Sequence, residues 1–195
     1  MHHLIYPDFF KKMRRGPQII TIKDMAIISA MTGVCSGFRI VDAGSGSGFL
    51  AAYLGNLVKP EGSVISYEIR KEHAEIALKN ILKAGLGKFV TIKNKDIFEG
   101  IDEKDLDLIT LDMPETFKAV KIAFDALKPG GWVVSYVPSI EQMREFVLEC
   151  KKSGFENIES FENIMRAIEV KSLGTHPQNK GVFHTGYISF ARKKG

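Results

Sequence analysis

The sequence Val41-Asp42-Ala43-Gly44-Ser45-Gly46-Ser47-Gly48-Phe49-Leu50 decides the fold, because it joins a predicted strand to a predicted helix. The residues before it, 38–41, are mostly apolar and β-branched, as in a buried strand. The apolar residues after it recur at helical spacing: Phe49, Leu50, Ala52, Tyr53, Leu54 and Leu57. Glycine at alternate positions permits a tight turn and lets a ligand lie against the backbone, facing the free N–H groups of the helix.

The 195-residue chain has a globular composition, with 45% hydrophobic and 26% charged residues. We expect one domain over residues 1–195, in which 1–15 form an irregular N-terminal extension. Apolar runs are shorter than the ~18 residues of a membrane helix, and residues 1–15 lack the apolar segment of a secretory signal. Cys35 and Cys150 have no metal-ligand spacing. We therefore expect a cytoplasmic protein with neither a membrane nor a metal partner.

Basic residues cluster near both ends of a chain whose net charge is only +4. One cluster contains Lys11, Lys12, Arg14 and Arg15, and the other contains Arg192, Lys193 and Lys194. Such clusters either meet phosphates or are ordinary solvated termini, and composition alone favours the second interpretation.

Predicted strands alternate with predicted helices through most of the chain. Asp24 is expected to cap a helix that ends at Gly33. The predicted strands are 38–42, 63–67, 89–93, 106–111 and 132–136, the predicted helices are 47–57, 71–84, 115–127 and 140–152, and a turn is predicted at 127–131. Two extended stretches, 155–170 and 182–192, are joined by a polar loop and should pair antiparallel at one sheet edge. This order predicts an α/β fold with a mostly parallel sheet covered on both faces.

Acidic residues at successive strand ends indicate which ligand the glycine loop, residues 44–48, holds. A dinucleotide site needs a third glycine where Phe49 stands, and Asp42 would repel a pyrophosphate. S-adenosylmethionine has a sulfonium and an amino group and no phosphate. Glu68 could accept its ribose hydroxyls and Asp96 its adenine amino group. Each acid alone is more often a solvated loop residue, but together with the loop they predict an S-adenosylmethionine site.

Four stretches resemble the class I methyltransferases, and more closely the tRNA (adenine-N1)-methyltransferases that modify the T-loop. They are Arg15 to Ile20 with Lys23-Asp24, Ser66 to Arg70 with His73, Leu111 to Glu115, and His184 to Tyr187 with Phe190 to Arg192. The resemblance implies a Rossmann-like methyltransferase fold with a seven-stranded sheet and an antiparallel edge strand. It also implies tRNA as a partner and a homo-oligomer, a tetramer in this family.

The resemblance further implies roles for individual residues. The cofactor would be bound by Gln18, Asp42, Gly44, Ser45, Gly46, Ser47, Gly48, Glu68, His73, Asp96, Ile97 and Asp112. Asp112 would also lie beside the target base. A carboxylate there can accept a hydrogen bond from the adenine amino group and stabilise the positive charge that N1 methylation creates. From the residues alone, Asp112 could equally cap the helix that begins near Pro114.

The substrate base could contact Phe117, Tyr136 and His184, although core packing or a structural role is at least as common for such residues. The chain departs from the family pattern at Thr21, Ile22, Thr116, Phe117 and His176, and only a short segment stands where relatives carry an N-terminal β domain. These departures concern RNA binding more than cofactor binding.

The expected function is methyl transfer to N1 of a T-loop adenine in tRNA. One alternative keeps the cofactor but changes the acceptor to a small molecule, as in corrinoid synthesis, or to a protein. The other is a tRNA-binding partner subunit that does not use the cofactor. A subunit that does not use the cofactor would have no need of the cofactor site. The presence of Asp42, Glu68, Asp96 and Asp112 therefore argues against this last alternative.

Overall fold

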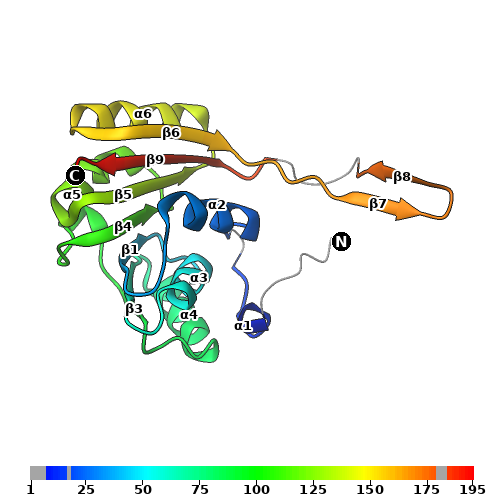
Figure 1. Cartoon of the computed structure of the whole chain (residues 1–195). Helices are drawn as coiled ribbons and strands as arrows, with labels where there is room; N and C mark the ends of the chain where they lie inside the picture. The colour runs from blue at the N-terminus through cyan, green and yellow to red at the C-terminus, as the bar shows by residue number, and fades with distance from the viewer. Residues whose placement is uncertain (1–7, 17–18, 179–183) are drawn as a thin grey trace.

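A computed structural model describes residues 8–16, 19–178 and 184–195. Seven strands form one sheet in the order β3-β2-β1-β4-β5-β9-β6 (Figure 1). Their bounds are β1 Arg39–Ala43, β2 Ser63–Tyr67, β3 Val90–Lys93, β4 Leu106–Leu111, β5 Leu127–Val137, β6 Phe155–Glu162 and β9 Tyr187–Lys193. Strands β1 to β5 are parallel, whereas β9 pairs antiparallel with both β5 and β6. The predicted sheet is confirmed, and its antiparallel strand lies between β5 and the outermost strand, β6.

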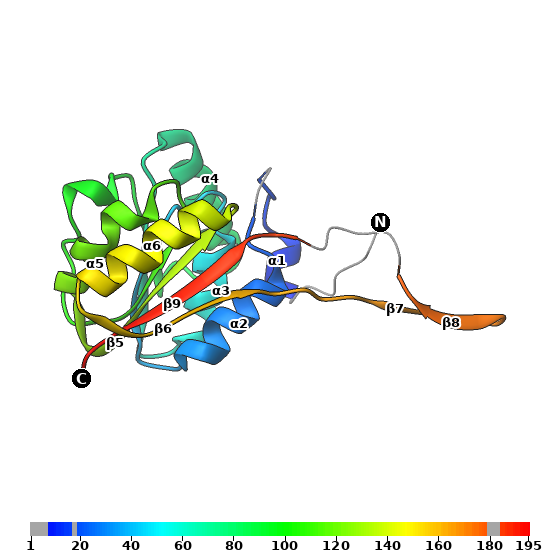
Figure 2. The ribbon, with the colours of Figure 1, turned by 90° about the horizontal axis from the view of Figure 1, so that it is seen from above.

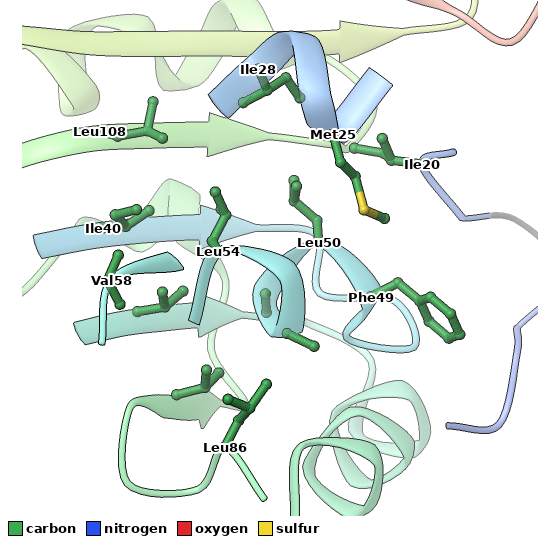
Figure 3. Packing of buried hydrophobic residues seen from close by; sticks show 14 of the residues in the cluster. Ile20, Met25, Ile28, Ile40, Phe49, Leu50, Leu54, Val58, Leu86 and Leu108 are labelled. Atoms are coloured by element: carbon green, nitrogen blue, oxygen red, sulfur yellow. The ribbon is translucent and has the colours of Figure 1, made fainter. Parts of the chain in front are cut away.

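Helices cover both faces of the sheet (Figure 2). The helices α2 Ile22–Thr32, α3 Phe49–Leu57 and α4 Lys71–Lys83 contribute to one core cluster, and α5 Val120–Ala126 and α6 Ile140–Lys152 contribute to the other. Successive strand residues point to opposite faces, so Ile40 joins the first cluster and Val41 the second. Figure 3 shows α2 and α3 packing in the first cluster. Within the described ranges, no helix is long and apolar enough to cross a membrane.

The order of the strands places a crevice at the end of β1. From β1 the chain moves to β2 and β3 on one side, and it returns to β4 and β5 on the other. The carboxyl ends of parallel strands on the two sides of such a switch point form the usual ligand site of an open α/β sheet. The glycine loop follows β1 at this position.

The structure corrects the N-terminal predictions. The extension expected to be irregular contains a short helix, α1 Asp8–Lys11. Phe10 of α1 is buried and its ring stacks on Phe49, with centroids 5.1 Å apart. The predicted cap Asp24 is wrong, because Thr21 occupies the N-cap position of α2 while Asp24 lies buried within its first turn.

Two predicted elements in the second half are also different. The predicted helix 115–127 is a 3₁₀ turn, η2 Thr116–Ala119, followed by α5. The predicted turn 127–131 lies within β5. Leu127 pairs with β4 and pairing resumes at Trp132, so the residues between them form a bulge that a local turn signal cannot distinguish from a loop.

A hairpin occupies part of the stretch where a continuous strand and a polar loop were expected. Strands β7 Ile168–Lys171 and β8 Gly174–Pro177 pair antiparallel and project away from the sheet (Figures 1 and 2). Large apolar side chains are exposed on or near them, namely Ile164, Met165, Ile168, Val170 and Leu173. Residues 163–178, which contain this hairpin, are called the arm below.

Candidate functional site

The glycine loop is held between the carboxyl ends of β2 and β4. Gly44 N and Ser45 N both donate to Tyr67 O, at 2.9 and 3.1 Å. On the other side, Asp112 N donates to Ala43 O at 2.8 Å. The backbone bonding that begins in the sheet therefore continues into the loop and fixes its position at the crevice.

The three loop glycines meet different surroundings. Gly44 has a φ of +88°, and a Cβ there would overlap the carbonyl oxygen of Asp112. Gly48 has a φ of +80°, and its Cβ would lie 3.2 Å from the backbone of Ala77. Gly46 has a φ of +52°, and the nearest atom to its Cβ would be Gly44 O at 3.9 Å. Gly44 and Gly48 thus permit close packing within the protein, and Gly46 is the position with space for a ligand.

Asp42 lies beneath the loop and joins three strands. Its two carboxylate oxygens accept hydrogen bonds from Ser66 Oγ at 2.6 Å and Thr110 Oγ1 at 2.7 Å. Ser66 Oγ also lies 2.5 Å from Ser45 Oγ in the glycine loop. Burial raises the pKa of Asp42, while the two hydroxyl groups act in the opposite direction. Asp42 therefore positions the loop from below, and its direct contact with a cofactor stays a prediction.

Glu68 follows β2 and lies against the loop. Its Oε2 accepts a hydrogen bond from Gly46 N at 2.9 Å, and its Oε1 accepts one from Arg70 N at 3.0 Å. Only 3% of Glu68 is exposed. A carboxylate held by the loop in this way can still accept hydrogen bonds at its remaining lone pairs, as recognition of a ribose diol requires.

The structure describes three further predicted cofactor residues, Asp96, Ile97 and His73. Asp96 Oδ1 accepts a hydrogen bond from Phe98 N at 2.9 Å and caps the 3₁₀ turn η1 Ile97–Glu99. Asp96 is half-buried after β3, and Ile97 is buried beside it. His73 is half-buried on α4. Gln18 lies outside the described residues. The binding roles of all four stay predictions.

Asp112 is the carboxylate in this site that the protein leaves available. Within 8–16, 19–178 and 184–195, no group donates a hydrogen bond to its side chain, and the residue is partly exposed. Burial, and then the negative charges of Asp42 and Glu68, raise its pKa from 3.8 to about 7. The alternative role as a helix cap is wrong, because Glu115 occupies the N-cap position of η2.

A small hollow adjoins Asp112. It lies where α2 and α3 meet the ends of β4 and β5, and it is lined by Ile20, Ile28, Leu50, Thr110, Leu111, Asp112, Val134 and Tyr136. Aliphatic side chains and one phenol ring surround a single carboxylate there.

Among the three predicted substrate residues, Tyr136 is the one that lines the hollow beside Asp112. The Tyr136 hydroxyl donates to Thr185 O at 2.6 Å. Phe117 is half-buried in η2 and does not line this hollow. His184 Nδ1 lies 2.6 Å from Glu162 Oε1, and this hydrogen bond raises the pKa of His184. The structure brings Tyr136 to Asp112, whereas substrate contacts by Phe117 and His184 stay predictions.

Asn80 was not predicted, although it joins the site to the N-terminal segment. Its Oδ1 accepts a hydrogen bond from Arg14 N at 2.7 Å, and its Nδ2 donates to Arg14 O and Ser47 O, both at 2.8 Å. Gly16 N also donates to Ser47 Oγ at 3.3 Å. The sequence signal is a polar residue three positions after Ala77, among the apolar residues of the predicted helix 71–84.

The two basic clusters lie at different ends of the sheet. Arg192 Nε donates to Gly130 O at 2.9 Å, and Lys193 Nζ donates to Leu127 O at 2.6 Å, where β5 begins. The N-terminal cluster adjoins the glycine loop through Asn80 and is exposed. Only the N-terminal cluster therefore lies near the crevice.

The donor set fits S-adenosylmethionine better than a phosphate-bearing cofactor. Glu68, Asp96 and Asp112 follow β2, β3 and β4, which lie on both sides of β1 and its glycine loop. Their negative charges disfavour a pyrophosphate. In the described parts of the chain, no group of three or more His, Cys, Asp or Glu residues is placed to hold a metal ion.

Comparison with known proteins agrees with this geometry. A curated relative, the tRNA (adenine(57)-N(1)/adenine(58)-N(1))-methyltransferase TrmI of Methanocaldococcus jannaschii, is 38% identical over 211 residues, which cover 95% of this chain and 75% of the relative. A solved SAM-dependent O-methyltransferase from Thermotoga maritima has a TM-score of 0.91 and 36% identity, covering 97% of this chain and 72% of that one. The solved tRNA (m1A58) methyltransferase TrmI of Aquifex aeolicus has a TM-score of 0.87 and 26% identity. The match covers 97% of this chain and 77% of that one.

The family described as tRNA methyltransferase complex GCD14 subunit matches residues 10–176, which include the glycine loop, all the predicted acidic residues and most of the arm. The resemblance seen in the sequence is thereby confirmed. The protein belongs to the tRNA methyltransferase complex GCD14 subunit family.

Proposed function

We propose that this protein is an S-adenosylmethionine-dependent methyltransferase that methylates N1 of an adenine in the T-loop of tRNA. The observation that carries the proposal is the available carboxylate of Asp112, which lies beside the glycine loop and shares an apolar hollow with Tyr136. The family match supports the same substrate class.

The cofactor would be held by the glycine loop and the acids around it. Glu68 would accept hydrogen bonds from ribose hydroxyls, and Asp96 would accept one from the adenine amino group. When bound, the cofactor supplies an electrophilic methyl group. The protein's task is then to hold the acceptor base in line with that group and to exclude water from the contact.

Asp112 would recognise and stabilise the acceptor base. Adenine N1 already has a lone pair, so the reaction needs no general base. In its ionised form, the Asp112 carboxylate would accept a hydrogen bond from the exocyclic amino group and stabilise the positive charge that develops on the ring. The Tyr136 ring, which lines the same hollow, would flank the base.

The N-terminal basic cluster would contact the tRNA backbone. Lys11, Lys12, Arg14 and Arg15 are exposed, and Asn80 ties the backbone of Arg14 to the glycine loop. Phosphate contacts from these side chains would orient the tRNA without reading its sequence. We place the protein in the cytoplasm, where its two free cysteines would stay reduced.

The test uses unmodified tRNA and labelled S-adenosylmethionine, with the modified base identified by mass spectrometry. The wild-type protein should produce 1-methyladenosine in the T-loop. Asp112→Ala should lower the transfer rate roughly 100-fold or more, because a charge-stabilising group is lost. Cofactor affinity, measured by calorimetry, should change far less. Label transferred to a small molecule or a protein in place of tRNA would refute the proposed acceptor.

We also propose that the protein is a homo-oligomer, a tetramer, in which the arm contacts another copy. Val170 is 78% exposed and Leu173 is fully exposed, and such apolar surface on a projecting hairpin is typical of an interface. Light scattering should detect the oligomer, and Val170→Lys with Leu173→Lys should dissociate it. Lys171→Glu, in the same hairpin, is the control for a change of charge alone. A monomeric wild-type protein would refute this proposal.

A further inference from the structure

A buried ion pair lies where the arm meets α2. Lys23 Nζ lies 2.7 Å from Asp24 Oδ1, and the side chains of Lys23 and Asp24 are 9% and 0% exposed. Lys23 Nζ also donates to Asn163 O at 2.5 Å and to Thr185 Oγ1 at 2.7 Å. An ammonium group has three N–H donors, so these three acceptors use all of them.

The acceptors come from both ends of the segment that contains the arm. Asn163 begins the arm after β6, and Thr185 precedes β9. Asn163 Nδ2 donates back to Lys23 O at 2.9 Å, so the residues are joined in both directions. Figure 2 shows α2 lying beside the stretch where β6 leads into β7. Lys23, Asp24, Asn163 and Thr185 are called the Lys23 cluster.

The cluster continues into the hollow beside Asp112. Thr185 Oγ1 donates to Asp24 Oδ2 at 2.8 Å, and the carbonyl oxygen of Thr185 accepts the hydrogen bond from Tyr136, at 2.6 Å. The next residue packs directly on that ring, because a Cβ at Gly186 would lie only 2.7 Å from Tyr136 Cζ. The position of Tyr136 is therefore set by the same groups that hold the arm.

A purely structural role does not require a buried ion pair at this position. Removing two charges from water costs free energy that their attraction recovers only partly, and an apolar pair of similar size often stabilises a protein as well. A buried pair does, however, impose one geometry, because a displaced partner would leave the other charge without compensation. Here the geometry it imposes joins α2, both ends of the arm segment and one wall of the hollow.

We propose that Lys23 is a positioning residue that fixes Tyr136 and the arm relative to Asp112, and so sets the position of the methyl-accepting base. This inference rests on the proposed function of the hollow. Among the described residues, Lys23 forms no hydrogen bond with the glycine loop, which Asn80, Glu68 and Tyr67 hold. Its loss should therefore impair use of the acceptor and leave the cofactor site intact.

The test compares Lys23→Met with Lys121→Met. Lys121 forms a 2.7 Å ion pair with Asp125 on the surface, so it controls for the loss of a lysine charge. Lys23→Met should raise KM for unmodified tRNA or lower kcat by roughly tenfold or more, since Asp24 is left buried without a counter-charge. Cofactor affinity measured by calorimetry should stay within about twofold of wild type, given that no bond to the loop is lost.

Hydrogen exchange provides a measurement that does not depend on activity. Lys23→Met should speed exchange in residues 163–168 and 184–188 relative to both wild type and Lys121→Met. Thr185→Ser keeps both side-chain hydrogen bonds and should behave as wild type, whereas Thr185→Val should resemble Lys23→Met. Adding Asp24→Asn to Lys23→Met removes the unpaired charge and should restore part of the protection.

Two results would overturn the inference. One is unchanged exchange in residues 163–168 and 184–188 of Lys23→Met, together with unchanged KM and kcat for tRNA. The other is a loss of cofactor affinity equal to the loss of tRNA methylation, which would indicate general destabilisation. If wild-type protein binds the cofactor but methylates no tRNA, the proposed function fails, and exchange at Tyr136 and the arm still tests the coupling.

Discussion

Asn80 on α4 and Ser47 in the glycine loop are joined by a 2.8 Å hydrogen bond from the Asn80 amide nitrogen to the Ser47 carbonyl oxygen. The same nitrogen donates to Arg14 O, and Asn80 Oδ1 accepts from Arg14 N. One buried side chain therefore connects the loop, α4 and the N-terminal segment that carries the basic cluster.

Asn80→Leu should detach this segment and weaken cofactor binding. Leucine has a similar volume but leaves the backbone groups of Arg14 and Ser47 without partners, at a cost of about 2 to 4 kcal/mol in the free energy of unfolding. Calorimetry should show cofactor affinity lower by roughly tenfold. Trypsin should cleave after Arg14 and Arg15 faster than in wild type. Lys79→Ala, at the exposed neighbouring position, should match wild type in all three measurements.

Gly44→Ala should destabilise the protein much more than Gly46→Ala. Both positions have positive φ, so each substitution strains the backbone by about 1 to 2 kcal/mol. Only at Gly44 does the added Cβ also overlap Asp112 O, which should bring the loss to about 3 kcal/mol or more. Denaturant unfolding of the two variants measures the difference. Equal losses would show that the close packing of Gly44 on Asp112 does not constrain the loop.

Ionisation of Asp112 should lower the free energy of unfolding as the pH rises. Its pKa is about 7 in the folded protein and near 3.8 when unfolded, so the folded state holds the proton more tightly between these values. Its contribution to stability is complete below about pH 4 and is lost as the pH rises through about 7. Asp112→Asn should therefore be more stable than wild type above neutral pH, by about 2 to 4 kcal/mol, and this advantage should shrink in acid. Chemical denaturation at several pH values measures it.

Methyl transfer should have the opposite pH dependence. The ionised carboxylate accepts the hydrogen bond from adenine, so the rate should rise by about tenfold per pH unit below neutrality and level off above the Asp112 pKa of about 7. Asp112→Asn should be slow at every pH and lack this rise. A wild-type rate that stays constant from acid to neutral pH would show that ionisation of Asp112 does not control transfer.

The sequence predicted the glycine loop and the acids around it because the signals are local. A strand, a turn and a helix within residues 38–57 reveal their periodicity in a short window. Glu68, Asp96 and Asp112 each follow a strand, and the carboxyl ends of parallel strands meet at one edge. The convergence of these acids therefore follows from the order of elements alone.

Only the tertiary structure shows which of the acidic side chains already accept hydrogen bonds from within the protein. Asp42 is bonded by Ser66 and Thr110, whereas the Asp112 carboxylate remains available, and no local pattern distinguishes the two acids. Beyond their own helices, the contacts of Lys23 and Asn80 join residues 33 to 162 positions apart in the sequence. Such pairings depend on how the arm, α2, α4 and β9 pack together, so only the folded chain places Tyr136 beside Asp112.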